Sequence, residues 1–171
     1  MTAGPKLEGE RVVLRPATER DLPAIVAILR EPSVARWWGE YDAARAGQEF
    51  LEDEETAAFV IEAEGEVAGL IQYGEETDPM YHHASIDIFL ASRFQGRGLG
   101  PEAIRTLARY LFARGHHRLT IDPAADNRNA IRAYEAVGFR PVGIMRQYER
   151  GADGSWHDGL LMDLLADELR S

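Results

Sequence analysis

The stretch Gln95-Gly96-Arg97-Gly98-Leu99-Gly100 is the most specific in the chain, because it joins an apolar run to a helical pattern. The run ASIDIFLA at residues 84–91 predicts a buried strand. Beyond the glycines, apolar residues with helical spacing predict an amphipathic helix that ends near Gly115: Ile104, Leu107, Ala108, Leu111 and Phe112. Glycines in such a turn let the backbone approach an anion, and the free N–H groups of the helix's first turn bind phosphate oxygens. The stretch therefore predicts a strand, an anion-binding turn and a helix.

Two better-known phosphate-binding motifs do not match this turn. A Walker loop needs Lys followed by Ser or Thr after the last glycine, whereas Pro101 and Glu102 follow here. The dinucleotide-binding fingerprint needs an acidic residue at the end of a second strand about 20 residues on, and the chain does not meet that requirement. On local sequence alone, a tight connection that binds no ligand is the alternative interpretation.

The pattern on either side of this segment predicts antiparallel pairs at both ends of a mixed sheet. The expected strands are 12–17, 57–64, 66–74, 118–122, 139–150 and 156–165. The expected further helices are Leu22–Leu29, capped by Thr18 or Asp21, residues 42–53, and Asn127–Val137, ended by Gly138. The single-residue connection at Gly65 and the turn Ala152-Asp153-Gly154 both favour hairpins. Strands and helices that alternate in the centre, between hairpins, indicate an α/β fold.

Length and composition restrict the class of protein. The 171 residues are enough for a single domain, which we expect to span residues 1–171. There is no cysteine, which excludes a disulfide scaffold, a thiolate nucleophile and a cysteine-ligated zinc site, and agrees with a reducing cytoplasm. The sequence has no run of 18 apolar residues and no secretory signal at its N-terminus, so we expect a cytoplasmic protein that does not bind a membrane.

Charge is distributed unevenly along the chain. Residues 40–80 hold 13 acidic side chains and one basic one, Arg45, whereas the other 130 residues hold 16 acidic and 18 basic ones. Residues 93–118 contain six arginines and one acid, Glu102. An acidic third and a basic segment suit one cationic and one anionic ligand, although two solvated faces would have the same composition. The acidic segment would repel phosphates, so we expect no nucleic-acid partner.

The chain order around the glycine-rich turn resembles the GNAT superfamily of acyl-CoA-dependent N-acetyltransferases. The resemblance spans about residues 11–165 and rests on the turn after a buried strand, a further strand, and Asn127 followed by Tyr134-Glu135-Ala136-Val137-Gly138-Phe139. It implies the GNAT fold: a central, mostly antiparallel twisted sheet with one parallel pair at the acyl-CoA site, flanked by about four helices. It also implies acetyl-CoA as co-substrate, and the residues expected to bind it are Phe89, Leu90, Gln95, Gly96, Arg97, Gly98, Leu99, Gly100, Asn127 and Ala130. Pro101 departs from the pattern, because it has no N–H to offer a phosphate.

Further segments look like the aminoglycoside 6′-N-acetyltransferases of antibiotic resistance, which acetylate a polycation. These segments are Arg36-Trp37-Trp38-Gly39, Glu75-Glu76-Thr77-Asp78-Pro79, Ile86-Asp87 and Asp122-Pro123. The residues that this resemblance implies for the acceptor are Trp37, Trp38, Glu75, Glu76, Asp78, Asp122 and Asp153. The chain lacks the longer, tryptophan-containing insertion that better-known members have before the two glutamates, so the resemblance implies no ring-stacking contacts from that insertion here.

Two residues are candidates for the chemistry. Asp87 lies inside an apolar strand, where a carboxylate is costly unless it is paired or has a function, and we expect it to act as the base. Tyr134 takes the place of the family's tyrosine near the thioester sulfur, although it also fits an apolar stripe on its helix. Asp122 ends the next predicted strand and should lie beside Asp87. His82 and His83 lack metal-ligand company nearby in the sequence, so we expect no metal site.

These observations predict an enzyme that transfers acetyl from acetyl-CoA to a primary amine, the 6′-amine of an aminoglycoside. An acetyltransferase for ribosomal-protein N-termini or for another small amine is the alternative enzyme, and a GNAT fold that binds acyl-CoA without turnover is the alternative binding module. The expected assembly is a monomer or a homodimer. Adjacent residues of a helix diverge by about 100°, so we expect only one of Trp37 and Trp38 to face the acceptor.

Overall fold

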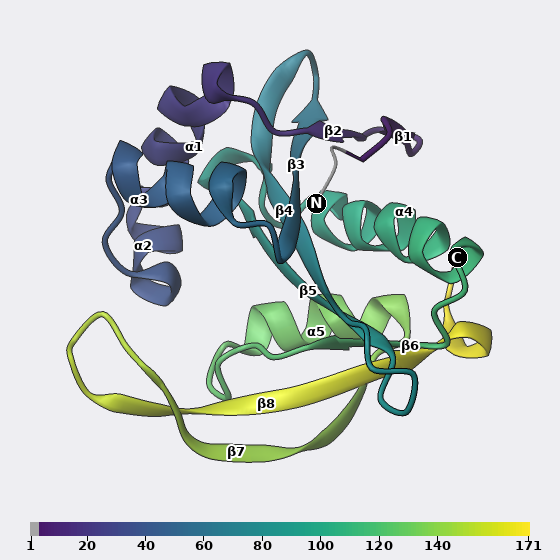
Figure 1. Cartoon of the computed structure of the whole chain (residues 1–171). Helices are drawn as coiled ribbons and strands as arrows, with labels where there is room; N and C mark the ends of the chain where they lie inside the picture. Colours follow the sequence, from purple (N-terminus) through teal and green to yellow (C-terminus); the bar gives the residue numbers. More distant parts are fainter. Residues whose placement is uncertain (1–3) are drawn as a thin grey trace.

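A computed structural model describes residues 4–171 and contains an eight-stranded sheet in the order β1-β2-β3-β4-β5-β6-β8-β7. The strands are β1 (Leu7–Glu8), β2 (Val13–Pro16), β3 (Thr56–Ala63), β4 (Glu66–Glu76), β5 (His83–Leu90), β6 (Arg118–Ile121), β7 (Arg140–Arg150) and β8 (Trp156–Leu165). The helices are α1 (Leu22–Leu29), α2 (Pro32–Trp38), α3 (Ala43–Gly47), α4 (Leu99–Ala113) and α5 (Arg128–Val137). Figure 1 shows β1–β5 with α1–α4 in the upper part of the molecule and β6–β8 with α5 in the lower part.

The sheet is antiparallel except at one pair of neighbours, which confirms the prediction of a mostly antiparallel sheet with one parallel pair. β5 and β6 run parallel and share only two register pairs, Ala84↔Leu119 and Ser85↔Thr120. The hydroxyl groups of Ser85 and Thr120 lie 2.8 Å apart and join the two strands at this end. Beyond Ser85, no described residue of β6 pairs with β5, so the strands separate and leave one backbone edge of residues 86–90 available to a ligand.

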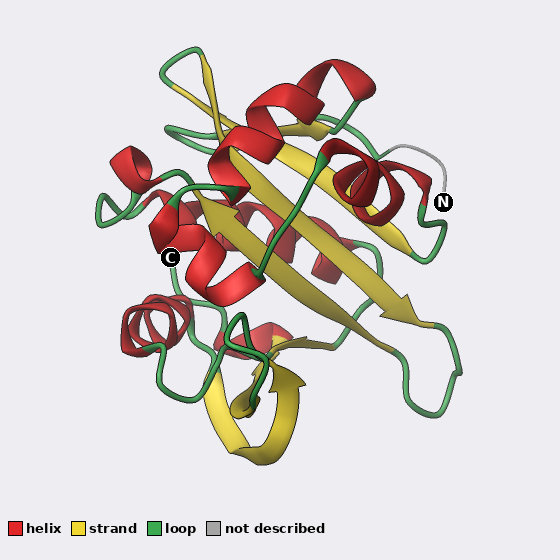
Figure 2. Cartoon of the chain, turned by 90° about the vertical axis from the view of Figure 1, so that its left-hand side faces the viewer, coloured by secondary structure: helices red, strands yellow, loops and turns green. Residues whose placement is uncertain are grey.

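The apolar stripe of α4 anchors the glycine-rich turn to this sheet. Ile104, Leu107 and Leu111 are fully buried, and each such side chain contributes about 1.5–3 kcal/mol to folding. Gly115 follows the helix with φ +103, a backbone conformation that favours glycine, as expected for the end of this helix. The turn at the N-terminus of α4 is therefore held in place by a helix with buried residues along its length. Figure 2 shows helices both in front of and behind the long strands of the sheet.

The prediction for the region between α1 and β3 was wrong in two respects. Residues 32–38 form the helix α2, so five helices flank the sheet where about four were expected. Pro32 ends α1, but it also occupies the first turn of α2, where its missing N–H costs nothing. In place of the single helix expected at 42–53, the chain forms the short helix α3 and then a π-helical turn at Gln48–Glu52. The Asp42 carboxylate caps α3 by accepting the N–H of Arg45 at 2.8 Å. The short strand β1 was not predicted either.

Among residues 4–171, no helix has the length and apolar character that crossing a membrane requires.

Candidate active site

A cavity of about 680 Å³ opens where β5 and β6 separate. Its wall is built from several elements: α2, the second half of β5, the glycine-rich turn with the first residues of α4, the end of β6, α5, and one residue of β7. Of the residues proposed from the sequence, it brings together Trp37, Trp38, Asp87, Phe89, Leu90, Gln95, Gly96, Gly98, Gly100, Asp122, Asn127, Ala130 and Tyr134. Segments that are far apart in the sequence therefore meet where the parallel strands β5 and β6 separate.

The glycine-rich turn presents main-chain groups to this cavity. Gly96 has φ +72 and Gly98 has φ +78, and both conformations are strained for any residue with a Cβ. Gly98 is also the N-cap of α4, so the N–H groups of the first helical turn have no partner within the helix. The Gln95 side chain donates to the carbonyl of Leu90 at 2.9 Å and joins the turn to the end of β5. Positive φ, free N–H groups and the helix dipole together form a cradle for an anion.

Two side chains of the turn point away from the cavity. Leu99 is only 2% exposed and packs in the core. The Arg97 guanidinium pairs with Glu64 at 2.6 Å, and its carbonyl accepts a hydrogen bond from Arg11 at 2.8 Å. Arg97 and Leu99 can therefore serve an anion only through their backbone.

The aromatic residues on α2 form one side of the cavity. The Trp38 ring packs edge-on against Phe89 of β5 with 5.0 Å between centroids, and it also contacts Tyr41 and Phe50. The Trp37 ring is covered by the Arg36 guanidinium at 4.4 Å. Both tryptophans line the cavity, contrary to the expectation that only one would face it. They can do so because the cavity borders a broad side of α2, which also includes Ser33 and Val34 one turn earlier.

Asn127 lies at the start of α5, on the opposite side of the cavity. Its side-chain oxygen accepts a hydrogen bond from Ala130 N–H at 3.2 Å, which caps the helix. This cap uses the carbonyl oxygen of the side chain and leaves its amide group for a ligand. The structural role and the expected contact with the cofactor are therefore compatible.

Three carboxylates gather in this cavity: Asp87 on β5, Asp122 after β6, and Glu149 on β7. Asp87 is open to the water of the cavity and enclosed by protein on its other sides. This partial burial, and next the charges of Asp122 and Glu149, raise the pKa of Asp87 to about 6, although the Gln72 amide acts in the opposite direction. Burial also raises the pKa of Asp122 and of Glu149, and Asp122 raises that of Glu149 further. A protonated amine would relieve this repulsion.

Two phenols accompany the carboxylates. Tyr134 of α5 is half-buried with its ring 6.4 Å from that of Phe139, and burial raises the pKa of its hydroxyl. Tyr148 of β7 donates its hydroxyl to the Asp122 carboxylate at 2.6 Å. Because both pKa values lie above the ordinary one, both phenols keep their protons at neutral pH. The Tyr134 hydroxyl therefore has a proton to donate, and Tyr148 fixes the orientation of Asp122.

The acidic residues expected near the acceptor do not all reach this cavity. Gln72 pairs with Asp87 across the sheet, so Glu75, three residues further along β4, points to the other face. There it lies 3.6 Å from both Arg114 and His116. Glu76 and Asp78 are exposed where β4 leads into its loop, and the Asp78 carboxylate accepts the N–H of Met80.

Asp153 lies in the turn between β7 and β8, outside the lining of the cavity. Its carboxylate binds His157 at 2.9 Å and Ser155 at 2.8 Å, and the contact with His157 is the main cause that lowers the pKa of Asp153 and raises that of His157. Its side chain therefore stabilises the turn.

Glu75, His82 and His116 form a cluster whose ligand atoms lie within 4.8 Å of one another. The rings of His82 and His116 are stacked, with 4.3 Å between centroids and planes 15° apart. An imidazole binds a metal through a lone pair in its own plane, and two stacked planes cannot both contain one ion. Arg114 beside Glu75 also opposes a cation. The arrangement therefore does not fit a metal centre.

Sequence reasoning missed Tyr148 and Glu149. Both belong to a segment predicted correctly as a strand, but strict alternation of side chains would send these neighbours to opposite faces. Their register with β8, which the sequence does not give, brings Glu149 to the cavity wall and the Tyr148 hydroxyl to Asp122.

Comparison with known proteins agrees with this geometry. Residues 11–140 match the model of the acetyltransferase (GNAT) domain. Over 157 residues, the chain is 31% identical to the aminoglycoside N(6′)-acetyltransferase type 1 of Klebsiella pneumoniae, covering 80% of this chain and 77% of that protein. It is 27% identical over 158 residues to the spermidine N(1)-acetyltransferase of Escherichia coli K12, covering 88% and 84%. A solved structure of AAC(6′)-Ib in complex with paromomycin and acetyl-CoA superposes with a TM-score of 0.77 at 28% identity, covering 93% of this chain and 96% of that one.

Proposed function

The chain belongs to the GNAT acetyltransferase family and uses acetyl-CoA as its co-substrate, and from this premise we propose that it acetylates a primary amine of a polycationic aminoglycoside, the 6′-amine. The observation that carries this proposal is the group of three carboxylates, Asp87, Asp122 and Glu149, around one cavity. Among residues 4–171, no ion pair links any of these three to a lysine, arginine or histidine. Their negative charge is available to a cationic acceptor.

The anion cradle fits the pyrophosphate of coenzyme A. The main chain of residues 95–100 would bind the phosphate oxygens, and the free edge of β5 near Phe89 and Leu90 would pair with the extended arm, as an added strand does. Acetyl-CoA supplies the acetyl group as a thioester at the end of that arm. Asn127 and Ala130 would border the arm from α5. Pro101 leaves one amide fewer in the first turn of α4, without removing the amides of residues 98–100.

The carboxylates and Tyr134 suit proton transfer during direct attack by the amine. Asp87, directly or through one water, accepts a proton from the bound ammonium group, and the neutral amine then attacks the thioester carbon. The pKa of about 6 makes Asp87 a better base than an ordinary aspartate and leaves it mostly ionised at neutral pH. Tyr134 donates a proton to sulfur as the C–S bond breaks. The ammonium group thus loses two protons: Asp87 passes the first to solvent, and the second, lost as the C–N bond forms, balances the proton that the thiol gains. Direct attack by the amine needs no covalent acyl-enzyme, and the chain has no cysteine to form one.

Asp122 would bind the ammonium form of the acceptor and hold it beside Asp87. The hydrogen bond from Tyr148 fixes the Asp122 carboxylate, so less conformational freedom is lost when the acceptor binds. A hydrogen-bonded and sheltered contact between a carboxylate and an ammonium contributes about 1.5–3 kcal/mol, whereas an exposed one contributes at most about 1 kcal/mol. Asp87 and Asp122 should therefore discriminate among acceptors more strongly than the exposed Glu76 and Asp78.

An amine panel tests the proposal through the release of free thiol from acetyl-CoA. The panel contains kanamycin, spermidine, and a peptide with a neutral N-terminal alanine. We expect kanamycin to give the highest kcat/KM, and its KM to rise with salt because charges attract it. If the peptide outcompetes kanamycin with no dependence on salt, the acceptor assignment is wrong. If acetyl-CoA binds and no amine is acetylated, the chain is a binding module.

A linear polyamine is the second candidate acceptor, because the chain resembles a spermidine acetyltransferase over 88% of its length. The same panel separates the two candidates. Regiochemistry follows from mass spectrometry and NMR of the acetylated product.

A further inference from the structure

An irregularity in the β7–β8 pairing sets the direction of two side chains at the cavity. Met145 pairs with Gly159 and Glu149 pairs with His157, so three residues of β7 face one residue of β8. At the centre of this bulge, Gln147 has φ +49, an unusual value for a residue other than glycine. Its N–H donates to the Asp158 carboxylate at 2.8 Å, which stabilises the strained backbone. Bulges of this kind change the direction of side chains beside functional sites.

The bulge directs Glu149 toward the cavity and Tyr148 toward Asp122, a residue of its lining. Neighbours in a regular strand point to opposite faces, yet the Tyr148 hydroxyl binds Asp122 and Glu149 lines the cavity wall. Gly159 on β8 leaves the room that this requires, because a Cβ there would lie 2.9 Å from the Tyr148 ring. Three features thus support the bulge: the positive φ of Gln147, its contact with Asp158, and the glycine at position 159.

The position of Glu149 matters because two carboxylates already occupy the cavity. The charges of Asp122 and Glu149 act on Asp87, and that of Asp122 acts on Glu149, so the three lie within range of one another. Asp87 of β5 and Asp122, which directly follows β6, both line the cavity, and we assign the reacting ammonium group to this pair. Glu149 enters from β7, a strand that β8 separates from β6. Its carboxylate is therefore placed for a second cation.

We propose that Glu149 is a specificity-determining residue that binds a second ammonium group of the acceptor, so that the enzyme prefers molecules with two or more amines. The proposal rests on the function proposed above and deepens it. It places the second amine on the side of the cavity formed by the β7–β8 ribbon.

Two amines that differ only in the second charge test this proposal. The probes are 1,5-diaminopentane and 1-aminopentane, which share the reacting group, and the readout is the ratio of their kcat/KM values. Removing the Glu149 charge also changes the field at Asp87, but this affects both amines and cancels in the ratio. In the Glu149→Gln variant we expect the ratio to fall by about 10-fold to 100-fold, the range typical of a lost charged hydrogen bond. Glu149→Asp should retain part of the preference.

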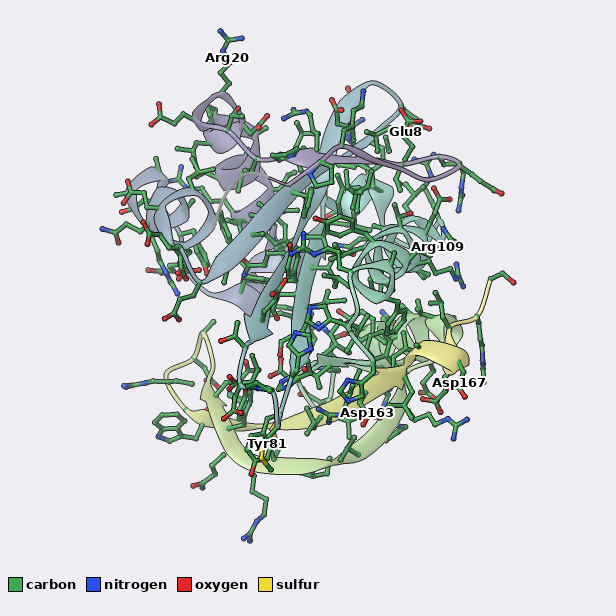
Figure 3. All side chains as sticks on the ribbon, turned by 45° about the vertical axis from the view of Figure 1, so that its right-hand side comes forward. Glu8, Arg20, Tyr81, Arg109, Asp163 and Asp167 are labelled. Atoms are coloured by element: carbon green, nitrogen blue, oxygen red, sulfur yellow. The ribbon has the colours of Figure 1, made fainter. Side chains whose placement is uncertain are left out.

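A charge-matched control uses Glu8, which lies at the far end of the molecule from the β7–β8 ribbon (Figure 3). Glu8→Gln should leave the ratio as in the parent protein, and thermal melting should show that all variants are folded. If the parent acetylates both amines and Glu149→Gln keeps the same ratio, the role of Glu149 is wrong while the proposed function stands. If the parent acetylates neither these amines nor kanamycin, the proposed function fails, and this inference fails with it.

Discussion

The raised pKa of Asp87 predicts how the reaction rate depends on pH. Over about pH 4.5–7.5 a primary alkyl amine stays protonated, so kcat/KM in this range depends on groups of the free enzyme. With a pKa of about 6, Asp87 is about one-tenth ionised at pH 5, so kcat/KM should fall about tenfold for each pH unit below 6 and level off above it. The assay is thiol release from acetyl-CoA with kanamycin as acceptor, at constant ionic strength.

Two substitutions test whether Asp87 causes the inflection of kcat/KM near pH 6. Asp87→Asn should lower kcat by about 10²-fold to 10⁴-fold, as expected for loss of a general base. Asp122→Asn removes a negative neighbour, so the inflection should move below pH 6. A pH-independent kcat/KM between pH 5 and 8, or an Asp87→Asn variant with most of its activity, would refute the assignment.

Stability should change with Asp87 in the direction opposite to activity. Because the pKa of Asp87 in the folded state lies above its ordinary value of 3.8, the folded protein holds this proton more tightly than the unfolded chain. The stabilisation is complete below about pH 4 and is lost as the pH rises through about 6. At pH 8, Asp87→Asn should therefore raise Tm while it lowers kcat, a combination that loss of folding cannot produce.

The remaining predictions concern the cofactor, the proton donor and the acceptor. Gly100→Asp should weaken acetyl-CoA binding far more than Gly100→Asn, because only the aspartate adds negative charge to the first turn of α4. Calorimetry measures both affinities, and equal values would contradict the proposed cofactor site. Tyr134→Phe should keep acetyl-CoA affinity and lower kcat by about 10-fold to 10³-fold, whereas an unchanged kcat would leave the ring a packing role. Asp122→Asn should raise the KM for kanamycin more than Glu75→Gln, because Glu75 faces Arg114 on the other side of the sheet; the reverse order would place the acceptor elsewhere.

Local chemistry made the cofactor half of the site predictable from the sequence. Gly96 and Gly98 adopt positive φ, so the glycines marked a backbone conformation that few other residues tolerate. Asp87 and Asp122 lie on neighbouring strands because the chain passes from β5 through α4 to a parallel β6, a connection that the order of elements already indicated. For these residues, the local sequence and the order of the elements were enough to predict where they lie in the fold.

The acceptor half depends on the register between distant segments, which local patterns do not reveal. Glu75 lies three residues from Gln72, and only the pairing of Gln72 with Asp87 shows that Glu75 is on the wrong face. Glu149 reaches the cavity, and Tyr148 reaches Asp122, through a bulge that Asp158 and Gly159 of the partner strand support. The helix α2 was missed for another reason: proline ends one helix and begins the next, and its two roles coincide at Pro32.

The β7–β8 ribbon joins the rest of the sheet through β6 alone, with β7 as the outer strand. One hairpin therefore holds Glu149 and the tyrosine that orients Asp122, whereas residues 84–130 hold the turn and the start of α5 that would bind the cofactor. Under the proposed function, the hairpin's contact with the acceptor can change without altering the segment that binds acetyl-CoA. Exchange of one contiguous segment, residues 140–165, would then alter the selectivity that Glu149 gives, while Asp87, Asp122 and the glycine-rich turn stay in place.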